Sequence, residues 1–466
     1  MKVVSMRTKR SIEKKPTNPK ITPRDFRSFL SLLEEQGELV RITKPVSSEF
    51  ELPAVVSNLE GKEAILFEEV DKSEFKVASN VIGTRRRFSL ALAMREHNLV
   101  HSQFLQLHGN TSEPKKMSGT APFYENSSKD LSELPIVTHF EKDAGPYITS
   151  SIVFAKDLEK GTQNSSTHRL LKIDDKKMVI RMVEGRHLHK CYCSATEHGE
   201  DLKVAIVIGV HPAVSIAAAY QAAYGVDEML IANSLLDGEL TVSKSHYSQL
   251  YVPTCSEIVL EGRILKDKTR DEWMVEMLRT YDFKRKQPVF ELDRIRFRNN
   301  AIFHDILPGF AEHRLLMGLP VEAKIFEAVK NVVPTTLSVY LTDGGSNWLN
   351  AVIQIRKRLE GEPKNALLAA FASHPSLKIA IVVDHDIDPR DPRAVEYAIS
   401  TRCQADRGLM IVQNAKGSSL DPSSDQSNLV TTKMGIDATA TLLKPKDRFE
   451  VARIPGQEKI KLSDYF

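Results

Sequence analysis

One stretch of the chain, residues 161–189 (GTQNSSTHRLLKIDDKKMVIRMVEGRHLH), gathers most of the side chains that could do chemistry. It holds an amide, neighbouring hydroxyls, guanidinium groups and imidazoles: Asn164, Ser165, Ser166, Thr167, Arg169, Arg181, His187 and His189. Residues 177–182, KMVIRM, are largely apolar and predict a strand among these polar groups. Buried amide, imidazole and guanidinium groups need partners, so their clustering indicates a site. A solvated hairpin is the alternative, and the rest of the chain must decide between the two.

A divalent metal is the first chemistry that these residues suggest. Asn164 and one imidazole offer an oxygen and a nitrogen ligand, and Glu228 offers a carboxylate at the start of a predicted helix. Such a set suits Mn²⁺ or Mg²⁺ better than zinc. Alternatively, Glu228 only stabilises the helix N-terminus by its charge.

Four potential zinc ligands also occur at alternate positions, so that on a strand they would share one face: His187, His189, Cys191 and Cys193. Their spacing does not match the usual C-x2–4-C arrangement of zinc sites. We therefore favour the mixed oxygen and nitrogen site.

Acid–base chemistry is suggested by Asp271 and Glu276, in the segment DEWMVE. Two carboxyl groups near an arginine can divide their roles, one remaining ionised and the other holding a proton because its pKa is raised. A surface helix with scattered acids is the alternative.

The composition is ordinary for a globular protein, with 41% hydrophobic and 27% charged residues. At 466 residues it suggests two or three domains, and its small net charge of +3 does not favour a nucleic acid or a membrane surface as partner. Residues 1–20 are basic and predict a disordered tail, with RNA binding or targeting as an alternative role. The N-terminus lacks the apolar run of a secretory signal, and four cysteines suit a reducing compartment, so a cytoplasmic location is expected.

Three regions with different secondary-structure patterns follow the tail. Residues 21–134 predict a small α/β region: a helix capped by Thr22, then strands at 38–42, 64–68 and 75–81, and a helix at 89–95. The triple arginine at 85–87 is interpreted as a solvated helix start rather than a phosphate clamp.

Residues 135–318 are rich in strand patterns, at 147–154, 178–182, 203–210, 258–264 and 294–303. Only the helical patterns at 215–224 and 227–236 interrupt them. Consecutive strands favour an antiparallel barrel over a parallel sheet.

Residues 319–466 alternate between helical and strand patterns and predict a parallel α/β domain. Helices are expected at 321–331, 346–359, 365–372 and up to residue 400 from an Asp391-Pro392 cap, with strands at 336–341, 379–383 and 410–413.

These features together resemble the UbiD-type decarboxylases, enzymes of prenylated FMN. The resemblance extends from about residue 21 onward and rests on segments in a fixed order: Gln163-Asn164 with Arg169, Arg181, Arg186-His187, Glu228, VPTCSEIVLEG (252–262), RNNAIFHDILPG (298–309) and KMGIDAT (433–439). It implies an N-terminal α/β region, a central split β-barrel like that of flavin reductases, and a C-terminal α/β domain ending in dimer-forming elements.

The resemblance also implies the cofactors and their ligands. Asn164, His187 and Glu228 would hold the divalent metal, usually Mn²⁺, with a monovalent cation such as K⁺ nearby, and the metal would bind the flavin phosphate. The prenylated FMN would be lined by Thr167, His168, Arg169, Arg181, Met182, Val183 and His187, with Lys433 on its phosphate side.

The implied reaction is loss of CO₂ from an unsaturated acid. Arg169 would bind the substrate carboxylate with both arms, Glu276 would deliver the proton that replaces CO₂, and Asp271 would orient Arg169. Two departures from the family pattern stand out: DEWMVE replaces a Glu-Gly-Pro turn, and Ser165 and Ser166 replace the usual Val-Gly.

The segments HRLLMGLP (313–320), DIDP (386–389) and GSSLDP (417–422) resemble the archaeal branch, which includes enzymes that convert trans-anhydromevalonate 5-phosphate into isopentenyl phosphate. An aromatic or polyprenyl-hydroxybenzoate decarboxylase is the alternative within the family. A split-barrel flavin oxidoreductase would need a nicotinamide site, and no G-x-G-x-x-G motif follows a strand. A non-catalytic flavin- or nucleotide-binding homologue is a further alternative. The expected partners are a flavin prenyltransferase that supplies the cofactor and further copies of this chain.

Overall fold

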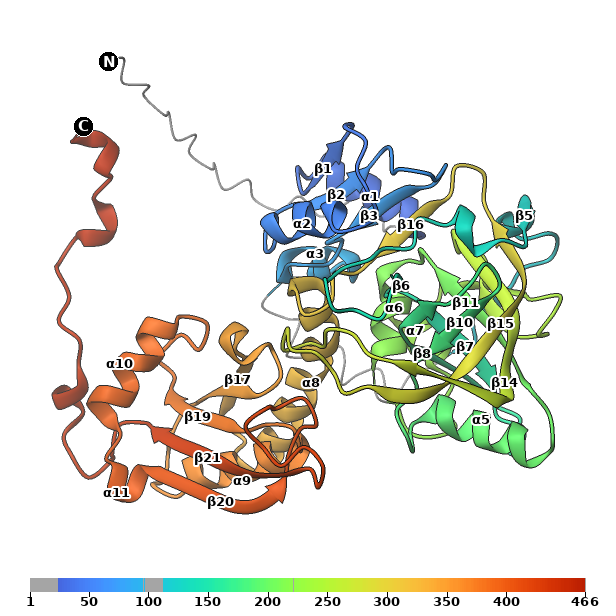
Figure 1. Ribbon diagram of the computed structural model, residues 1–466. Coiled ribbons are helices and arrows are strands. Elements are labelled where there is room, and N and C mark those ends of the chain that lie inside the picture. The colour runs from blue at the N-terminus through green and yellow to red at the C-terminus, as the bar shows by residue number, and fades with distance from the viewer. Residues whose placement is uncertain (1–23, 95, 97–111, 221, 466) are drawn as a thin grey trace.

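The computed structural model describes residues 24–94, 96, 112–220 and 222–465, arranged as three units joined in chain order (Figure 1). The predicted basic tail at 1–20 and the proposed cap Thr22 lie outside the described residues. The α/β multidomain class predicted from the sequence is confirmed. The domain boundaries remain predictions, and the one expected at residue 318 lies inside a continuous helix, α8 (Ala311–Val332).

In its described residues, the N-terminal unit contains a four-stranded sheet and the helices α1 (Phe26–Glu35), α2 (Glu51–Asn58) and α3 (Arg85–Ala91). Three of the strands are β1 (Leu39–Ile42), β2 (Ala64–Phe67) and β3 (Lys76–Ser79). Helix α1 begins one residue after Asp25, whose side chain accepts from Ser28 N–H, so Asp25 and not Thr22 is the cap. Its apolar stripe is buried, and Gly37, with φ of +69°, follows its end.

The fourth strand of this sheet comes from much later in the chain. The segment 294–303 predicted as one strand is divided into the end of β15 (Arg285–Phe297) and β16 (Ile302–Asp305), because Asn300 has a positive φ of 52°. Strand β16 then pairs in parallel with β3. It thereby attaches the central unit to the N-terminal sheet.

The triple arginine is not a solvated helix start. Thr84 caps α3, which begins earlier than predicted, and Arg87 is fully buried. Arg85 pairs with Glu322 of α8, and Arg86 pairs with Glu38 at 2.6 Å. These arginines therefore connect α3 to the rest of the protein.

The central unit is built on a nine-stranded sheet with the order β6-β9-β10-β15-β14-β11-β7-β8, and β5 pairs with β15. Its strands are β5 (Asn126–Ser128), β6 (Tyr147–Ile148), β7 (Ile152–Lys156), β8 (Gln163–Thr167), β9 (Leu170–Lys172), β10 (Lys177–Ile180), β11 (Leu202–Ile208), β14 (Ile258–Glu272) and β15. The pairings along this path are antiparallel, as predicted for a barrel.

Three helices and a small sheet complete the central unit: α5 (His187–Glu197), α6 (Pro212–Ala219), α7 (Glu228–Leu235), and β4 (Lys115–Lys116), β12 (Thr241–Lys244) and β13 (Tyr251–Pro253). Apolar side chains of the curved sheet and of the N-terminal sheet share one core. The sheet is therefore a rigid support for the loops at its edges.

The C-terminal unit, orange to red in Figure 1, lies beyond α8. It contains β17 (Thr336–Leu341), β18 (Asn350–Ile355), α9 (Glu362–Ser373), β19 (Ile379–Asp384), α10 (Pro392–Arg402), α11 (Ala405–Gly408), β20 (Leu409–Lys416) and β21 (Val430–Ala438). The sheet order is β17-β18-β19-β21-β20; the inner pairs are parallel, as predicted, whereas both edge pairs are antiparallel.

The helix expected at 346–359 is wrong. Ser346 and Asn347 have φ values of 56° and 51°, which stops a helix there, and the β-branched segment that follows is strand β18. Between β21 and residue 465 the described helices are short 3₁₀ turns, and large apolar side chains are exposed, among them Leu443, Ile454 and Leu462.

Candidate active site

Arg169 lies where the two ends of the curved nine-stranded sheet meet. Strand β8 ends one side of the sheet and β9 is next to the other end, yet only His168 and Arg169 separate them in the chain. The N–H of His168 donates to the carbonyl of Ser151 at 3.1 Å, and the Ser151 hydroxyl donates to the carbonyl of His168. This short, anchored link fixes Arg169 in the wall of the barrel.

Three carboxyl groups surround the Arg169 guanidinium. Its Nε and Nη2 donate to the two oxygens of Glu272 at 2.7 and 3.0 Å, Nη2 also donates to Asp282 at 3.2 Å, and Nη1 donates to Glu276. The Arg169 side chain is 11% exposed. Burial opposes its charge, but the carboxylates outweigh that effect and raise its pKa, so Arg169 stays protonated.

Arg169 contacts both Glu276 and Asp282, but the pKa values of these two carboxyl groups are shifted in opposite directions. Burial raises the pKa of Glu276, against the attraction of Arg169 and with the help of the negative charge on Asp282. Burial also opposes ionisation of Asp282, but the hydrogen bond from Arg285 and the charge on Arg169 outweigh it and lower its pKa. Of this pair, Glu276 is therefore the carboxyl group that binds a proton more readily.

Asp271 does not orient Arg169, contrary to the prediction. It is a neighbour of Glu272 on β14, so their side chains point to opposite faces of the strand. Asp271 is 43% exposed and pairs with Lys284 at 3.1 Å. Glu272 takes the expected place, and it also accepts a hydrogen bond from the hydroxyl of Tyr147 at 3.0 Å.

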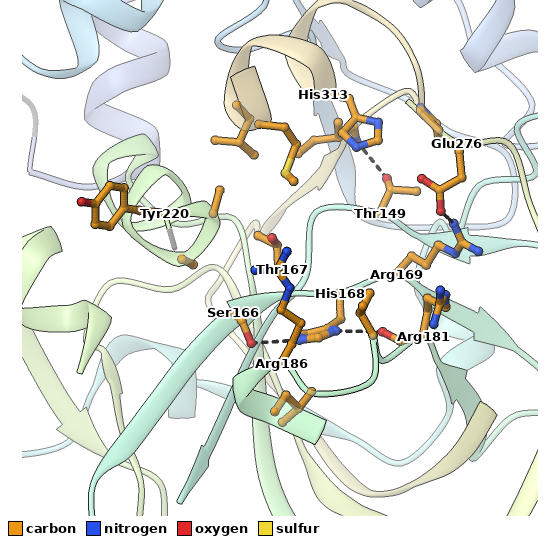
Figure 2. Close-up of a pocket in the computed structure, with 18 of the residues that line it drawn as sticks. Thr149, Ser166, Thr167, His168, Arg169, Arg181, Arg186, Tyr220, Glu276 and His313 are labelled. Atoms are coloured by element: carbon orange, nitrogen blue, oxygen red, sulfur yellow. Dashed lines mark hydrogen bonds and ion pairs between the residues drawn. The ribbon is translucent and has the colours of Figure 1, made fainter. Parts of the chain in front are cut away.

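His168 forms a fixed part of the wall between β8 and β10. Its Nδ1 lies 2.8 Å from the carbonyl of Arg181, and its Nε2 lies 2.8 Å from the Ser166 hydroxyl, as the dashed lines in Figure 2 show. A carbonyl only accepts, so Nδ1 carries the proton and Nε2 accepts from Ser166. Burial lowers the pKa of His168 to about 4, so the ring is neutral at physiological pH.

A second cluster lies at the other end of β8, around Glu228. The amide of Asn164 donates to Glu228 Oε1 at 2.9 Å, the N–H of Ser165 donates to Oε2 at 2.8 Å, and His187 Nδ1 lies 3.5 Å from Oε1. Glu228 is 2% exposed, and no arginine or lysine pairs with it among the described residues. A buried carboxylate beside an amide and an imidazole fits a divalent cation, since a cation would offset its buried charge.

The zinc alternative depended on a strand that does not form. His187, His189, Cys191 and Cys193 lie on helix α5, where residues two apart do not share a face. Among the described residues, no three side chains of histidine, cysteine, aspartate and glutamate gather around a common point. Any metal in this region would therefore depend on the Asn164 amide or on ligands from a bound molecule.

A cavity of about 360 Å³ connects the two clusters. Its size falls within the ~300–1,000 Å³ of small-molecule sites. Most residues predicted to bind the cofactor line it: Thr167, His168, Arg169, Arg181, Val183 and His187. Glu276 and Glu228 line it as well, and Figure 2 shows Arg169 and Glu276 facing each other at its wall.

Two of the predicted cofactor residues do not line the cavity. The Met182 side chain is 2% exposed within the barrel core, and only its backbone contacts a cavity residue, because its carbonyl accepts from Arg181 Nη1 at 2.6 Å. Lys433 lies on β21 in the C-terminal sheet, where its Nζ donates to the carbonyls of Pro375 and Leu377, both at 2.6 Å. Its expected role on the phosphate side of the flavin is wrong for this structure, because the backbone holds it elsewhere.

Residues that the sequence reasoning missed complete the site: Tyr147, Glu272, Asp282 and His313. The alternation of strand residues could have separated Glu272 from Asp271. Asp282 gave no such signal, because the loop between β14 and β15 brings it back to Arg169. His313 lines the cavity from the first turn of α8.

No helix among the described residues is both long and apolar enough to cross a membrane.

Three family models match the chain: the N-terminal, Rift-related and C-terminal domains of 3-octaprenyl-4-hydroxybenzoate carboxy-lyase, at residues 30–104, 115–311 and 314–438.

Curated relatives include the anhydromevalonate phosphate decarboxylase of Methanothermobacter thermautotrophicus, 40% identical over 92% of this chain and 100% of the relative. The enzyme of the same name from Methanocaldococcus jannaschii is 49% identical over 71% of this chain and 77% of its own length. Among solved structures, the UbiD-class enzyme HmfF from Pelotomaculum thermopropionicum, in complex with FMN, matches with a TM-score of 0.92 and 39% identity, covering 95% of this chain and 100% of HmfF. An evolved dimeric form of HmfF, in complex with prFMN, matches with a TM-score of 0.89 and 36% identity, covering 95% of this chain and 100% of that form. This chain therefore belongs to the UbiD family of carboxy-lyases.

Proposed function

We propose that this chain decarboxylates trans-anhydromevalonate 5-phosphate to isopentenyl phosphate, with prenylated FMN and a divalent metal, Mn²⁺ or Mg²⁺, as cofactors. The observation that carries the choice of substrate is the similarity to the archaeal enzymes, at 49% identity over 71% of this chain for one and 40% over 92% for another. The cavity supports it, because it brings the predicted arginine and the predicted proton donor together.

Prenylated FMN, when bound, supplies the electron sink that loss of CO₂ from an sp² carbon requires. The residues that would hold it are those of the cavity wall: Thr167, His168, Arg169, Arg181, Val183 and His187. The neutral His168 ring, fixed between a hydroxyl and a carbonyl, keeps this wall rigid. Asn164, His187 and Glu228 would hold the divalent metal, with a monovalent cation such as K⁺ nearby.

Arg169 would bind the substrate carboxylate, but its donors are almost all used. Of the five guanidinium N–H groups, four donate to Glu272, Glu276 and Asp282, so one on Nη1 has no partner among the described residues. A carboxylate that binds both N–H groups of Nη1 must therefore displace Glu276. A protonated Glu276 leaves easily, since a neutral carboxyl interacts more weakly with a guanidinium than a carboxylate does.

Glu276, once displaced, would deliver its proton to the carbon that loses CO₂. Burial raises its pKa, which favours the protonated form that this role requires. Apolar side chains of Met274, Ile306, Leu316 and Met317 line the same cavity and exclude water from the reacting carbon. Glu272 takes the orienting role that the sequence assigned to Asp271.

A flavin prenyltransferase would supply the cofactor, and we propose a homo-oligomer in the cytoplasm. The exposed apolar side chains after β21, with Leu443 at 86% and Ile454 at 70%, suit burial against a second copy. The four cysteines are all free thiols, which suits a reducing compartment.

The test uses protein produced together with a flavin prenyltransferase, with cofactor loading established by mass spectrometry. Incubation with trans-anhydromevalonate 5-phosphate should release isopentenyl phosphate and CO₂, and 4-hydroxybenzoate should not react. The variant Glu276→Gln should keep its flavin and lose turnover. Reaction of the aromatic acid alone would replace the proposed substrate, and full turnover by Glu276→Gln would remove Glu276 as the proton donor.

A further inference from the structure

Asp282 stands at the end of the loop that carries Glu276, and three guanidinium groups surround it. Its carboxylate lies 3.2 Å from Arg169 Nη2 and 3.8 Å from Arg181 Nε, and it also pairs with Arg285. The side chain is 5% exposed. Its backbone N–H donates to the carbonyl of Met274 at 2.9 Å, which fixes the carboxylate against the arginines.

Arg169 and Arg181 both line the cavity, and their like charges repel each other. Burial and the charges on Arg169 and Arg285 lower the pKa of Arg181, which shows how unfavourable this arrangement is without a compensating anion. Glu272 forms ion pairs with Arg169 but not with Arg181. Among the described residues, Asp282 is the carboxylate that pairs with both.

We propose that Asp282 is a positioning residue for the decarboxylation: it holds Arg169 and Arg181 side by side in the cavity wall, and its negative charge keeps the proton on Glu276. This inference rests on the proposed function. Asp282 does not line the cavity, so it acts through the two arginines and Glu276 and does not touch the substrate.

The proton on Glu276 depends on all the groups that face this cluster. Besides Arg169 and Asp282, they are Arg181, Arg285, Glu272, Asp143, Tyr147 and His313. Burial raises the pKa of Tyr147 and lowers that of His313 to about 4, so both are neutral near pH 7. Without the Asp282 charge, the arginines would be in excess and Glu276 would lose its proton at a lower pH.

The test compares Asp282→Asn, which removes the charge at nearly constant shape, with Asp282→Glu, which keeps it. The first readout is the infrared carbonyl band of the protonated Glu276 carboxyl in the flavin-loaded protein, identified by its absence in Glu276→Gln. In Asp282→Asn this band should disappear at a lower pH than in the wild type. In Asp282→Glu it should titrate as in the wild type.

The second readout is the pH profile of decarboxylation. In Asp282→Asn the alkaline limb of kcat/KM should move to lower pH, kcat at neutral pH should fall about tenfold, and KM should rise as the arginines separate. The matched control is Glu291→Gln, which removes a carboxylate of β15 from its ion pair with Arg263 of β14, at 2.7 Å, and should change neither readout.

An infrared titration that is the same in Asp282→Asn and in the wild type would overturn the inference, even if turnover fell. That result would leave Glu276 as a possible proton donor, because Glu276→Gln tests that role separately. A loss of turnover with unchanged band and unchanged pH limb would show that Asp282 has only a structural role. If Asp282→Asn does not fold, Asp282→Glu decides, since a displaced titration there would also contradict the proposal.

Discussion

Two buried arginines of this chain are satisfied in opposite ways. Arg169 faces three carboxyl side chains, which raise its pKa despite burial. Arg87 is fully buried, whereas the Arg169 side chain is 11% exposed. Arg87 donates mainly to backbone carbonyls, those of Val81, Asn80 and Lys62, and to one carboxylate, Glu38, at 3.3 Å. Burial lowers its pKa. Backbone carbonyls are fixed once the chain has folded, whereas a carboxyl side chain can turn away or take up a proton. Arg87 therefore joins segments of the fold, and Arg169 can exchange a partner for a substrate.

Of the variants that test this contrast, Arg169→Lys should have the largest effect, a loss of decarboxylase activity. The lysine keeps the charge, so the three carboxyl groups remain balanced, but it lacks the planar fork that positions a carboxylate. We expect kcat/KM to fall by about 10³-fold, while the free energy of unfolding changes by less than about 1 kcal/mol. Steady-state kinetics and urea unfolding measure the two. Near wild-type kinetics would mean that Arg169 contributes only charge.

Arg87→Met should reduce stability and leave activity unchanged, the reverse of Arg169→Lys. It leaves buried carbonyl oxygens without donors and Glu38 without one of its partners, so we expect unfolding to become easier by about 3 kcal/mol. The flavin-loaded protein that remains folded should keep its kcat. The neighbour Arg86 pairs with the same Glu38 but is 46% exposed, and Arg86→Met should cost less than about 1 kcal/mol. Equal losses in the two variants would contradict the contrast between them.

A smaller effect on activity should separate Glu272 from Asp271. Glu272→Gln weakens a two-armed bond to Arg169 and one from Tyr147, which should cost about 2 kcal/mol, or roughly thirtyfold in kcat. Asp271→Asn breaks only a half-exposed pair with Lys284 and should leave kcat within about twofold. Steady-state kinetics of the two variants measure this difference. A larger loss of kcat in Asp271→Asn than in Glu272→Gln would mean that Asp271, as the motif spacing predicted, orients Arg169.

The contrast between Arg169 and Arg87 also shows which features of the fold and the site can be predicted from the sequence. Strand patterns, helix caps such as Asp391 and the order of the motifs predicted three units and placed Arg169, Glu276, Asn164, His187 and Glu228 near one another. Such features are local or shared by a family. The roles of the triple arginine and Lys433 were wrong because a cation's partners come from distant segments: Arg87 meets Lys62, and Lys433 meets Pro375.

The missed acids have the same physical cause. Asp282 reaches Arg169 only because the loop between β14 and β15 folds back, with the N–H of Glu276 donating to the carbonyl of Thr280 at 2.8 Å. Ser346 and Asn347 stop the expected helix through backbone angles that their residue types permit but do not require. Tertiary contacts decide such cases, and no periodicity in the sequence records them.

Lys433 is predicted to affect stability and not flavin binding, and it gives the sharpest test of the comparison. Burial lowers its pKa to about 8 from 10.5 in the unfolded chain, although two carbonyls accept from its ammonium group. Between these values the unfolded chain binds a proton that the folded chain has released, so the free energy of unfolding should rise as pH increases from 8 to 10.5.

Urea unfolding below pH 8 and near pH 10 should show this rise in the wild type and in Lys416→Met, which alters an exposed lysine of β20. Lys433→Met removes the titrating group, so the rise should become smaller, and flavin loading should not change. Loss of flavin from Lys433→Met would instead restore the role on the phosphate side that the sequence motif predicted. Lys433 would then be a cation that exchanges its partners during function, as proposed for Arg169, and not one that only joins segments of the fold, as Arg87 does.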